Sequence, residues 1–370
     1  MSRPTSGGHT SSDGASPHQS ASPDQGQLPN DSAPPSESHR RATWLSVLAG
    51  VVVFIGGVVI AGQSRANGTL NLIVGDPIVT AILSTGSGWI GLCLMLGKRR
   101  SRAAFGKLAE ALRSRSMPWW MVTGGSFGAL VVTTQAFAVP IAGVALVTIC
   151  VVAGQTTTAI GVDRLGIGPA GVQPVSRARI LSAALALVGV GIAVGPRVTG
   201  GGTHLVLPVL LALTVGALLA FQAAMNGQVN RIGGSAATTT WINFSWALLI
   251  VCLVEVVRLA QGTAWPDFRL LEGPWWAWTG GILGATYVAL IAICVARLGV
   301  LLVTLLSVTG QLFGALVLDL LDPTLRHLVT VSTVTGVVLT LVASFGAALA
   351  ANRASRLARA RARDLTPPAA

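Results

Sequence analysis

Charged residues are scarce in this chain, and their scarcity excludes an ordinary soluble protein. Asp, Glu, Lys and Arg make up 10% of the 370 residues, while 52% of the residues are apolar. A soluble domain usually carries about 25% charged residues. The net charge of +12 would also suit a nucleic-acid-binding protein, but this apolar background favours a membrane protein with basic flanks and no nucleic-acid partner.

Patterns typical of enzymes and metal sites are missing as well. The four cysteines stand singly in apolar stretches, without a CxxC or Cys/His cluster that would bind a metal ion. The sequence holds no HExxH, GxSxG, P-loop or dinucleotide-binding fingerprint, and no acid, His or Ser constellation within an apolar run. We therefore predict a protein that is not an enzyme and uses neither a cofactor nor a metal.

Large apolar residues are almost absent from residues 1–39, which are rich in Ser, Pro, Gly, His and Gln. Such a segment cannot bury enough surface to fold, so residues 1–41 are predicted to be a disordered cytoplasmic tail. The tail also lacks the apolar core of a signal peptide.

From Trp44 onward the chain has a series of apolar runs long enough to cross a bilayer, which takes about 20 residues. Only helices and closed barrels span lipid, and these uninterrupted runs do not alternate as barrel strands do. We therefore predict an all-α integral membrane protein. Its ten predicted transmembrane helices are 44–62, 77–97, 118–137, 143–162, 178–196, 204–224, 236–257, 275–296, 299–319 and 327–350.

The chain also repeats itself. At a constant offset of 156, 20 of the 45 positions from 119 to 163 are identical to those from 275 to 319. Self-similarity of this kind indicates a duplicated unit, so we predict one five-helix repeat at 42–198 and a second at 199–350. At an offset of 159, the matching positions are Gly57, Gln63, Asn67, Gly68, Gly75 and Thr80 with Gly216, Gln222, Asn226, Gly227, Gly234 and Thr239.

The distribution of Lys and Arg predicts the orientation in the membrane. With a cytoplasmic N-terminus, 20 of the 25 basic residues lie in predicted cytoplasmic segments. Because positive charge accumulates on the cytoplasmic side, we predict a multi-pass protein of the cytoplasmic (inner) membrane with both termini inside. An odd number of helices per repeat then places the second repeat upside down, an inverted arrangement that recurs in secondary transporters.

The C-terminal tail, residues 351–370, is strongly basic. Its arginines are expected to fix the topology and to attract anionic membrane lipids. They are Arg353, Arg356, Arg359, Arg361 and Arg363.

Four glutamines are the most informative polar residues in the predicted spans: Gln63, Gln155, Gln222 and Gln311. An unpaired amide in hydrocarbon costs several kcal/mol, so each must bond another helix, the backbone, water or a substrate. Gln155 and Gln311 fall mid-helix at matching positions, where the midplane site of an inverted-repeat carrier would lie. Two interpretations stay open: hydrogen bonds between helices, or the wall of a substrate cavity.

Other polar and aromatic residues are weaker candidates. Gln135, Asn243 and Trp241 are unpaired in the repeat register and are further candidates for a cavity wall. Asn67 and Asn226 follow Gln63 and Gln222 by four residues, near predicted helix ends, where capping or turn formation is the expected role.

Acidic residues are few, and two of them match in the repeat. Asp163 and Asp319 close the fourth and ninth predicted helices at opposite faces. They are candidate gates at the two mouths of one pathway, or interfacial charges beside nearby arginines. Glu255 lies three residues before Arg258, a spacing that predicts a pair on one helix face.

The repeated motifs resemble a known family. Trp-Trp-x-x-x-Gly-Gly-x-x-Gly begins at Trp119 and at Trp275, and Val-Thr-x-x-x-x-x-Gly-Gln with an Asp eight residues on follows in each repeat. Together they resemble the YdcZ-type inner-membrane exporters, a branch of the drug/metabolite transporter superfamily. The resemblance extends over residues 44–350, and since many members are single five-span units, this chain resembles a fused pair.

The resemblance implies a ten-helix inverted-repeat fold and the movement of small molecules, with Gln155/Asp163 and Gln311/Asp319 at the matching positions. We therefore predict a secondary transporter that exports small organic metabolites or drugs by alternating access, with a small-molecule substrate as its partner. A membrane scaffold or sensor without a pathway is the alternative. The two differ in whether a cavity opens at Gln155 and Gln311.

Overall fold

The structure is a computed structural model that describes residues 37–95, 99–169 and 171–364. Residues 1–43 and residues 44–370 form two separate units. The tail predicted at 1–41 lies almost entirely outside the described residues, as do the last six residues of the basic C-terminal tail.

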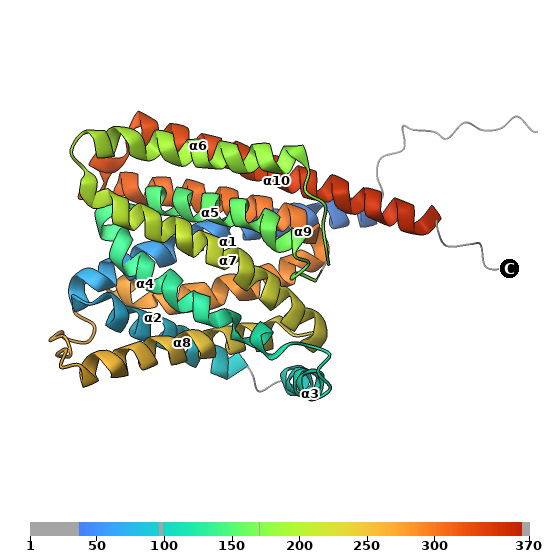
Figure 1. The fold of residues 1–370 in the computed structure, drawn as a ribbon, viewed down its shortest axis with the longest axis horizontal. Coiled ribbons are helices and arrows are strands. Elements are labelled where there is room, and N and C mark those ends of the chain that lie inside the picture. The colour runs from blue at the N-terminus through green and yellow to red at the C-terminus, as the bar shows by residue number, and fades with distance from the viewer. Residues whose placement is uncertain (1–36, 96–98, 170, 365–370) are drawn as a thin grey trace, which may run out of the picture. The chain divides into compact units, whose positions relative to one another are not determined.

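All regular secondary-structure elements of the described chain are helices (Figure 1). Short 3-10 turns precede four of the helices: η1 (Trp119–Gly124), η2 (Thr203–Leu205), η3 (Trp275–Thr279) and η4 (Arg326–Leu328). The α-helices are α1 (Glu37–Val74), α2 (Pro77–Met95), α3 (Arg99–Arg113), α4 (Gly125–Ala142), α5 (Val144–Arg164), α6 (Arg177–Thr199), α7 (Val206–Gly233), α8 (Ala236–Ala260), α9 (Gly280–Leu321) and α10 (Val331–Asp364).

The surface of the helices is typical of a membrane protein. Nine segments of the described chain are long and apolar enough to cross a bilayer. Large apolar side chains such as Leu181 on α6, Val256 on α8 and Val338 on α10 are exposed. A soluble protein rarely exposes so much apolar surface, whereas a protein in a bilayer exposes such side chains to lipid. The chain is therefore an integral membrane protein.

Helix α9 covers both the eighth and the ninth predicted spans, with no non-helical break between them. A straight helix would separate residues 20 positions apart by about 30 Å. Yet the Tyr287 hydroxyl lies 2.7 Å from the Ser307 hydroxyl, so α9 folds back on itself. Figure 1 shows its orange ribbon in two rows. The first arm begins at Gly280, and the second arm is Leu302–Leu321.

Two helices run well past their predicted ends. α1 continues to Val74 and α7 to Gly233, rather than stopping at 62 and 224. Each ends at a glycine with positive φ, Gly75 at 76° and Gly234 at 70°, a conformation that ends helices and favours glycine. The capping or turn-forming role predicted for Asn67 and Asn226 is therefore wrong, because both residues lie inside helices, α1 and α7.

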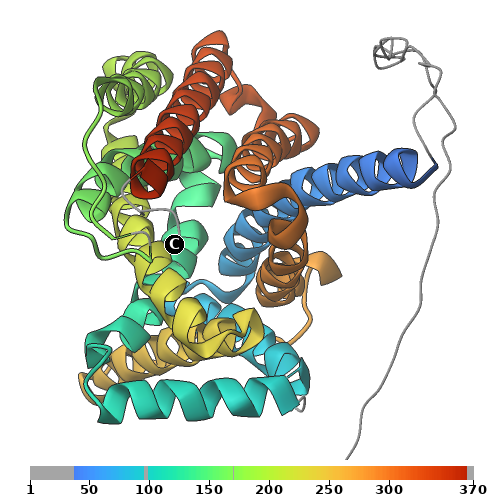
Figure 2. The same cartoon turned by 90° about the vertical axis from the view of Figure 1, so that its right-hand side faces the viewer.

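Helix α3 was not predicted as a helix, since the sequence indicated only a basic loop there. Its apolar face, with Ala104, Leu108 and Ala111 buried, packs near Val229 of α7, while Arg102 and Lys107 are exposed. Figure 1 shows α3 end-on while the spanning helices cross the view, and Figure 2 shows it lying across one end of the bundle. This is the geometry of an amphipathic helix at a membrane surface.

The two repeats pack through equivalent glycines. A Cβ atom on Gly154 of α5 would lie 2.1 Å from the Leu213 carbonyl oxygen of α7. A Cβ atom on Gly310 of α9 would lie 2.0 Å from the Phe54 carbonyl oxygen of α1. Leu213 and Phe54 differ by 159, and Gly310 and Gly154 by 156, the two offsets of the sequence repeat. The first helix of each repeat thus packs against the fourth helix of the other.

The Gly-Gly pairs make the same kind of contact. A Cβ atom on Gly125 would meet the Asn243 carbonyl oxygen at 2.0 Å, and one on Gly281 would meet the Ser84 carbonyl oxygen at 1.7 Å. Asn243 and Ser84 are again repeat equivalents. Small residues at these positions let the helix backbones approach closely.

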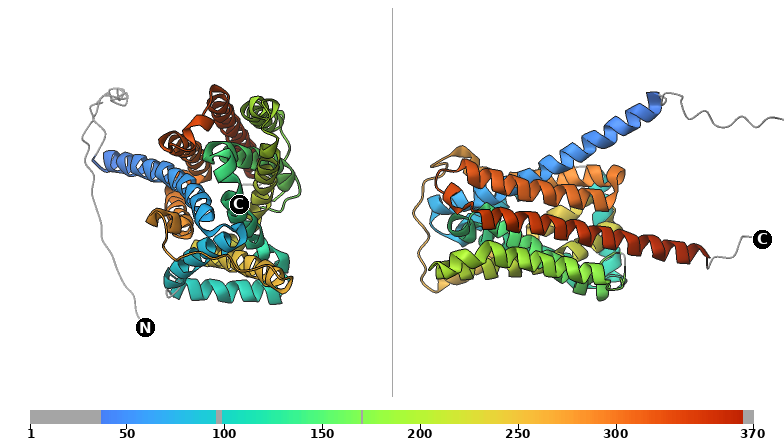
Figure 3. Two further views of the ribbon diagram at one scale, coloured as in Figure 1. Left: turned by 90° about the vertical axis from the view of Figure 1, so that its left-hand side faces the viewer. Right: turned by 90° about the horizontal axis from the view of Figure 1, so that it is seen from above.

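The two Trp-Trp motifs lie at opposite ends of the bundle. η1 packs against α7 near the α3 end, whereas η3 packs beside the turn between α1 and α2. These ends are the two ends of α8, which runs from Thr238 beside Ser101 of α3 to Arg258 beside Asp76. The start of the spanning part of α1 and the end of α10 lie at one end of the bundle (Figure 3), and this is the end at which α3 lies (Figure 1).

Candidate functional site

A polar cavity of about 250 Å³ lies between the two repeats, and we name it the amide cavity. Its polar lining comes from four helices of both repeats, and none of its described lining residues is Asp, Glu, Lys, Arg or His. The polar side chains are Gln63 and Ser64 of α1, Thr134 and Gln135 of α4, Thr148 and Gln155 of α5, and Tyr287 and Gln311 of α9.

Four residues predicted as candidates for a cavity wall line this cavity: Gln63, Gln135, Gln155 and Gln311. Gln63, Gln155 and Gln311 come together although they are far apart in sequence. Their side-chain amides make no hydrogen bond with another residue in the part of the chain that the structure describes. These three side chains are half-buried, so their amides are available to a bound solute or to water.

A second cavity, of about 190 Å³, adjoins the first and shares Gln63 and Tyr287 with it. Gln222 and Asn243, both predicted site residues, line it, and the Gln222 amide donates a 3.0 Å hydrogen bond to the Asn243 side chain. We name it the middle cavity, and its wall is more apolar than that of the amide cavity.

A third cavity, of about 320 Å³, lies at the α3 end beside the turn between α7 and α8, and we name it the vestibule. It shares Gln222 and Asn243 with the middle cavity and adds Asn226, Asn230 and Thr239. The three cavities therefore form a row from the centre of the bundle to its α3 end.

The equivalent place at the other end is filled. Asn67, the counterpart of Asn226, is fully buried and donates a 2.8 Å hydrogen bond to the Gln135 side chain. Ser84, the counterpart of Asn243, donates a 2.7 Å hydrogen bond to Asn67. The row of cavities therefore opens toward the α3 end, whereas the Asn67 network fills the equivalent place toward the turn between α1 and α2. A separate cavity of about 280 Å³ beside Arg65 and Asp322 lies at that end and shares none of the row's described lining residues.

Trp241, also a predicted site residue, lies elsewhere. Its indole N–H donates to Cys93 Sγ at 3.3 Å, and its ring packs edge-on against Phe105 of α3. It lines none of the three cavities just described. Tyr287 lines two of these cavities but was not predicted from the sequence. Its signal was its rarity, since it is the only tyrosine in the chain.

Asp319 caps the start of α5. Its carboxylate oxygens accept hydrogen bonds from the Val144 and Ala145 amides at 2.9 and 2.8 Å, and the residue is 2% exposed. A negative charge at a helix N-terminus is stabilised by the free N–H groups and the helix dipole. Arg65 and Arg197 lie close enough to attract the carboxylate.

Asp163, the repeat counterpart, has a different environment. It pairs with Arg179 of α6, and its side chain is 36% exposed. Neither aspartate thus pairs with the neighbouring arginine considered from sequence, Arg164 or Arg326.

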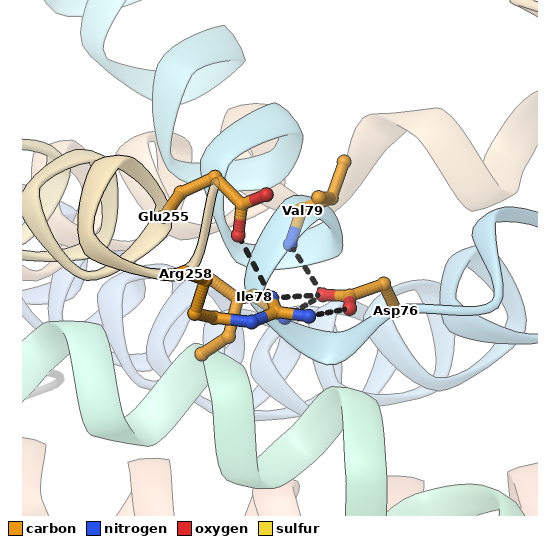
Figure 4. Close-up of polar contacts among 5 residues, drawn as sticks. All are labelled: Asp76, Ile78, Val79, Glu255 and Arg258. Atoms are coloured by element: carbon orange, nitrogen blue, oxygen red, sulfur yellow. Dashed lines mark hydrogen bonds and ion pairs between the residues drawn. The ribbon is translucent and has the colours of Figure 1, made fainter. Parts of the chain in front are cut away.

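A charged cluster ties α8 to the turn between α1 and α2 at the closed end (Figure 4). Arg258 pairs with Asp76 and, at 2.8 Å, with Glu255, which confirms the predicted Glu255–Arg258 pair. Asp76 also caps α2 by accepting hydrogen bonds from the amides of Ile78 and Val79. Burial alone would raise the pKa of the Asp76 carboxyl, but these hydrogen bonds and Arg258 outweigh it and hold the pKa below its usual value.

Comparison with known proteins agrees with the repeat. Curated proteins give no match to this chain. A family model described as "Putative inner membrane exporter, YdcZ" matches it twice, over residues 48–192 and residues 207–346. The two matched segments together cover well over half of the chain and correspond to the two repeats. The chain therefore belongs to the DMT_YdcZ exporter family, as a member in which the family unit occurs twice.

Proposed function

We propose that the chain is a secondary transporter that exports small organic solutes across the cytoplasmic membrane by alternating access. The observation that carries this proposal is the row of cavities, which starts between the repeats and is open toward one end only. A carrier must hold its solute near the middle of the membrane and face one side at a time. Family membership supports export as the direction.

The proposed architecture is ten spans in two inverted repeats, with the arms of α9 as the eighth and ninth. The reciprocal glycine contacts support it, because each repeat offers the same surface to the other. The distribution of basic residues supports a cytoplasmic location for the α3 end. The described conformation then faces the cytoplasm, ready to receive a solute for export.

Solute flux through purified protein in liposomes tests this function. Wild type should accelerate the release of at least one trapped metabolite, whereas Gln155→Leu and Gln311→Leu should reduce that flux at least tenfold. Gln261→Leu, at an exposed site beyond α8, is the matched control and should leave the flux unchanged. Cysteines placed at positions 155 and 311 that stayed unreactive from both sides would instead favour a scaffold or sensor.

We also propose that the arginines at the end of α10 bind anionic lipids. The helix continues to Asp364 and so carries the basic segment away from the spanning part as a helix. Each Arg near an anionic surface contributes roughly 1 kcal/mol. Changing the five to Gln should reduce the anionic lipid that co-purifies with the protein, and unchanged lipid content would refute this role.

A further inference from the structure

We propose that the amide cavity takes small uncharged solutes that both donate and accept hydrogen bonds, such as polyols or amides. This inference rests on the proposed transport function and specifies its substrate class. It starts from the lining: four glutamine amides and four hydroxyl groups, with no charged side chain or histidine among the described lining residues.

The lining is unsuited to ions. A charge moved from water into a low-dielectric site costs far more than a hydrogen bond returns, unless an opposite charge compensates it. Asp319, a buried acid of α9, does not line this cavity and is already bonded to the Val144 and Ala145 amides. A quaternary ammonium would need a cage of aromatic faces, and among the described lining residues of the amide cavity Tyr287 is the only aromatic one.

The lining is well suited to polyols and amides. A glutamine amide carries two donors and an acceptor, and a hydroxyl group can do both. Gln63, Gln155 and Gln311 keep their amides free of other described residues, and Gln135 uses only its oxygen, toward Asn67. The volume of about 250 Å³ falls below the roughly 300–1,000 Å³ of sites for drug-sized ligands, which favours a small metabolite.

The test is a flux assay in liposomes with probes matched in size and different in charge. Ribitol and nicotinamide are the neutral probes, choline is the cation and lactate is the anion. We expect flux of a neutral probe in wild type, a loss of at least tenfold in Gln155→Leu, and no loss in Gln261→Leu. Gln311→Glu supplies a countercharge and should shift preference toward choline.

The outcomes separate this inference from the transport function. Flux of choline or lactate alone, lost in Gln155→Leu, would overturn the substrate class while leaving the transporter intact. Absence of flux for every probe, together with unreactive cysteines at positions 155 and 311, would overturn the transport function and the substrate class with it.

A second, independent observation concerns Asp319 and Asp163. We infer that these two aspartates cap two helix starts in turn, one in each state of the transport cycle. In the described state Asp319 caps α5 just after Gly143, which has a φ of 85° and breaks the chain between α4 and α5. A Cβ atom on Gly143 would lie 2.8 Å from the Asp319 carboxylate, so this approach requires glycine.

The counterpart cap is not formed. The equivalents of Asp319 and Gly143 are Asp163 and Gly299. Gly299 lies within the continuous helix α9, and Asp163 is engaged with Arg179 instead. The formed cap lies at the closed end of the bundle and the unformed one at the open end. Exchange of the two repeats' conformations would break α9 at Gly299, cap its second arm with Asp163 and release α5.

Two substitutions should shift this equilibrium in opposite directions. Asp319 uses both carboxylate oxygens for the Val144 and Ala145 amides, so Asp319→Asn, with one acceptor oxygen and no charge, weakens the cap present now. It should raise labelling of Gln155→Cys by an impermeant maleimide from outside, by about five- to tenfold. Asp163→Asn weakens the cap of the opposite state for the same reason and should lower the same labelling by a similar factor. Asp267→Asn, an exposed acid, is the control. Shifts in the same direction, or none, would overturn the inference, since simple destabilisation moves both variants alike.

Discussion

At the scale of single residues, the ion pair between Asp76 and Arg258 gives a pH-dependent contribution to stability. The pKa of Asp76 is lower in the folded protein than its ordinary value of 3.8. The pair therefore stabilises the fold fully above that ordinary value and loses its effect as pH falls through the lower folded value.

Asp76→Asn keeps the cap on α2, because Asn is also a good cap, and removes the charge. We expect a loss of about 1 kcal/mol at pH 7 that shrinks below about pH 4, where wild type loses the same pair. Thermal unfolding in detergent between pH 3 and 7 measures it. Asp267→Asn should show no such dependence, and a deficit in Asp76→Asn that grows at low pH would contradict the assignment.

The glutamines were the part of the candidate site that the sequence could predict. Gln63, Gln155 and Gln311 stand out because an amide in an apolar run demands a partner, and the repeat places Gln155 and Gln311 at matching positions. The sequence could not predict which way each side chain points. Trp241 faces α2 and α3, and Tyr287 faces the cavity, because helix rotation is set by packing between helices.

At the scale of helices, close backbone contacts hold the repeats together, and α5 offers a matched test. Gly154→Ala would place a methyl group 2.1 Å from the Leu213 carbonyl oxygen, where nothing flexible can yield. Gly161 lies on the same helix with nothing within 4 Å of an added Cβ atom. Gly154→Ala should destabilise by about 1–3 kcal/mol, and Gly161→Ala should be neutral or gain up to about 1 kcal/mol.

Thermal unfolding of the two variants measures this difference. Equal effects of the two substitutions would mean that backbone helix propensity, and not the contact between α5 and α7, decides the stability of this region.

Hydropathy was enough to predict that the spanning helices exist, but it did not predict where they end or that α9 folds back on itself. The apolar runs located nearly every spanning element, yet α3 was missed because its charges dominate its composition, although its apolar face is buried. The reversal within α9 was predicted as a loop between 296 and 299. The structure instead keeps helical backbone through Gly299, and that residue's counterpart, Gly143, is the break between α4 and α5.

At the scale of the whole molecule, the two repeats make matching glycine contacts but differ in the polar residues at the two ends of the bundle. One end is closed by the buried Asn67 network, the cap from Asp319 and the Asp76–Arg258 pair. The Asp76–Arg258 pair has no equivalent at the other end, because the counterpart of Asp76 is Ser235. Differences in a few polar residues thus bias a near-symmetric pair of repeats toward one closed end.

The proposed transport cycle requires that the two repeats are inverted in the membrane, and the Trp motifs allow this inversion to be tested. Trp119 and Trp275 are repeat equivalents, 72% and 76% exposed. Trp119→Cys should react with an impermeant maleimide only in inside-out vesicles, and Trp275→Cys only in intact cells. Permeabilised cells should label both, which controls for reactivity. Labelling of both from the same side would place the repeats in parallel, and a parallel pair could not exchange an inward for an outward cavity.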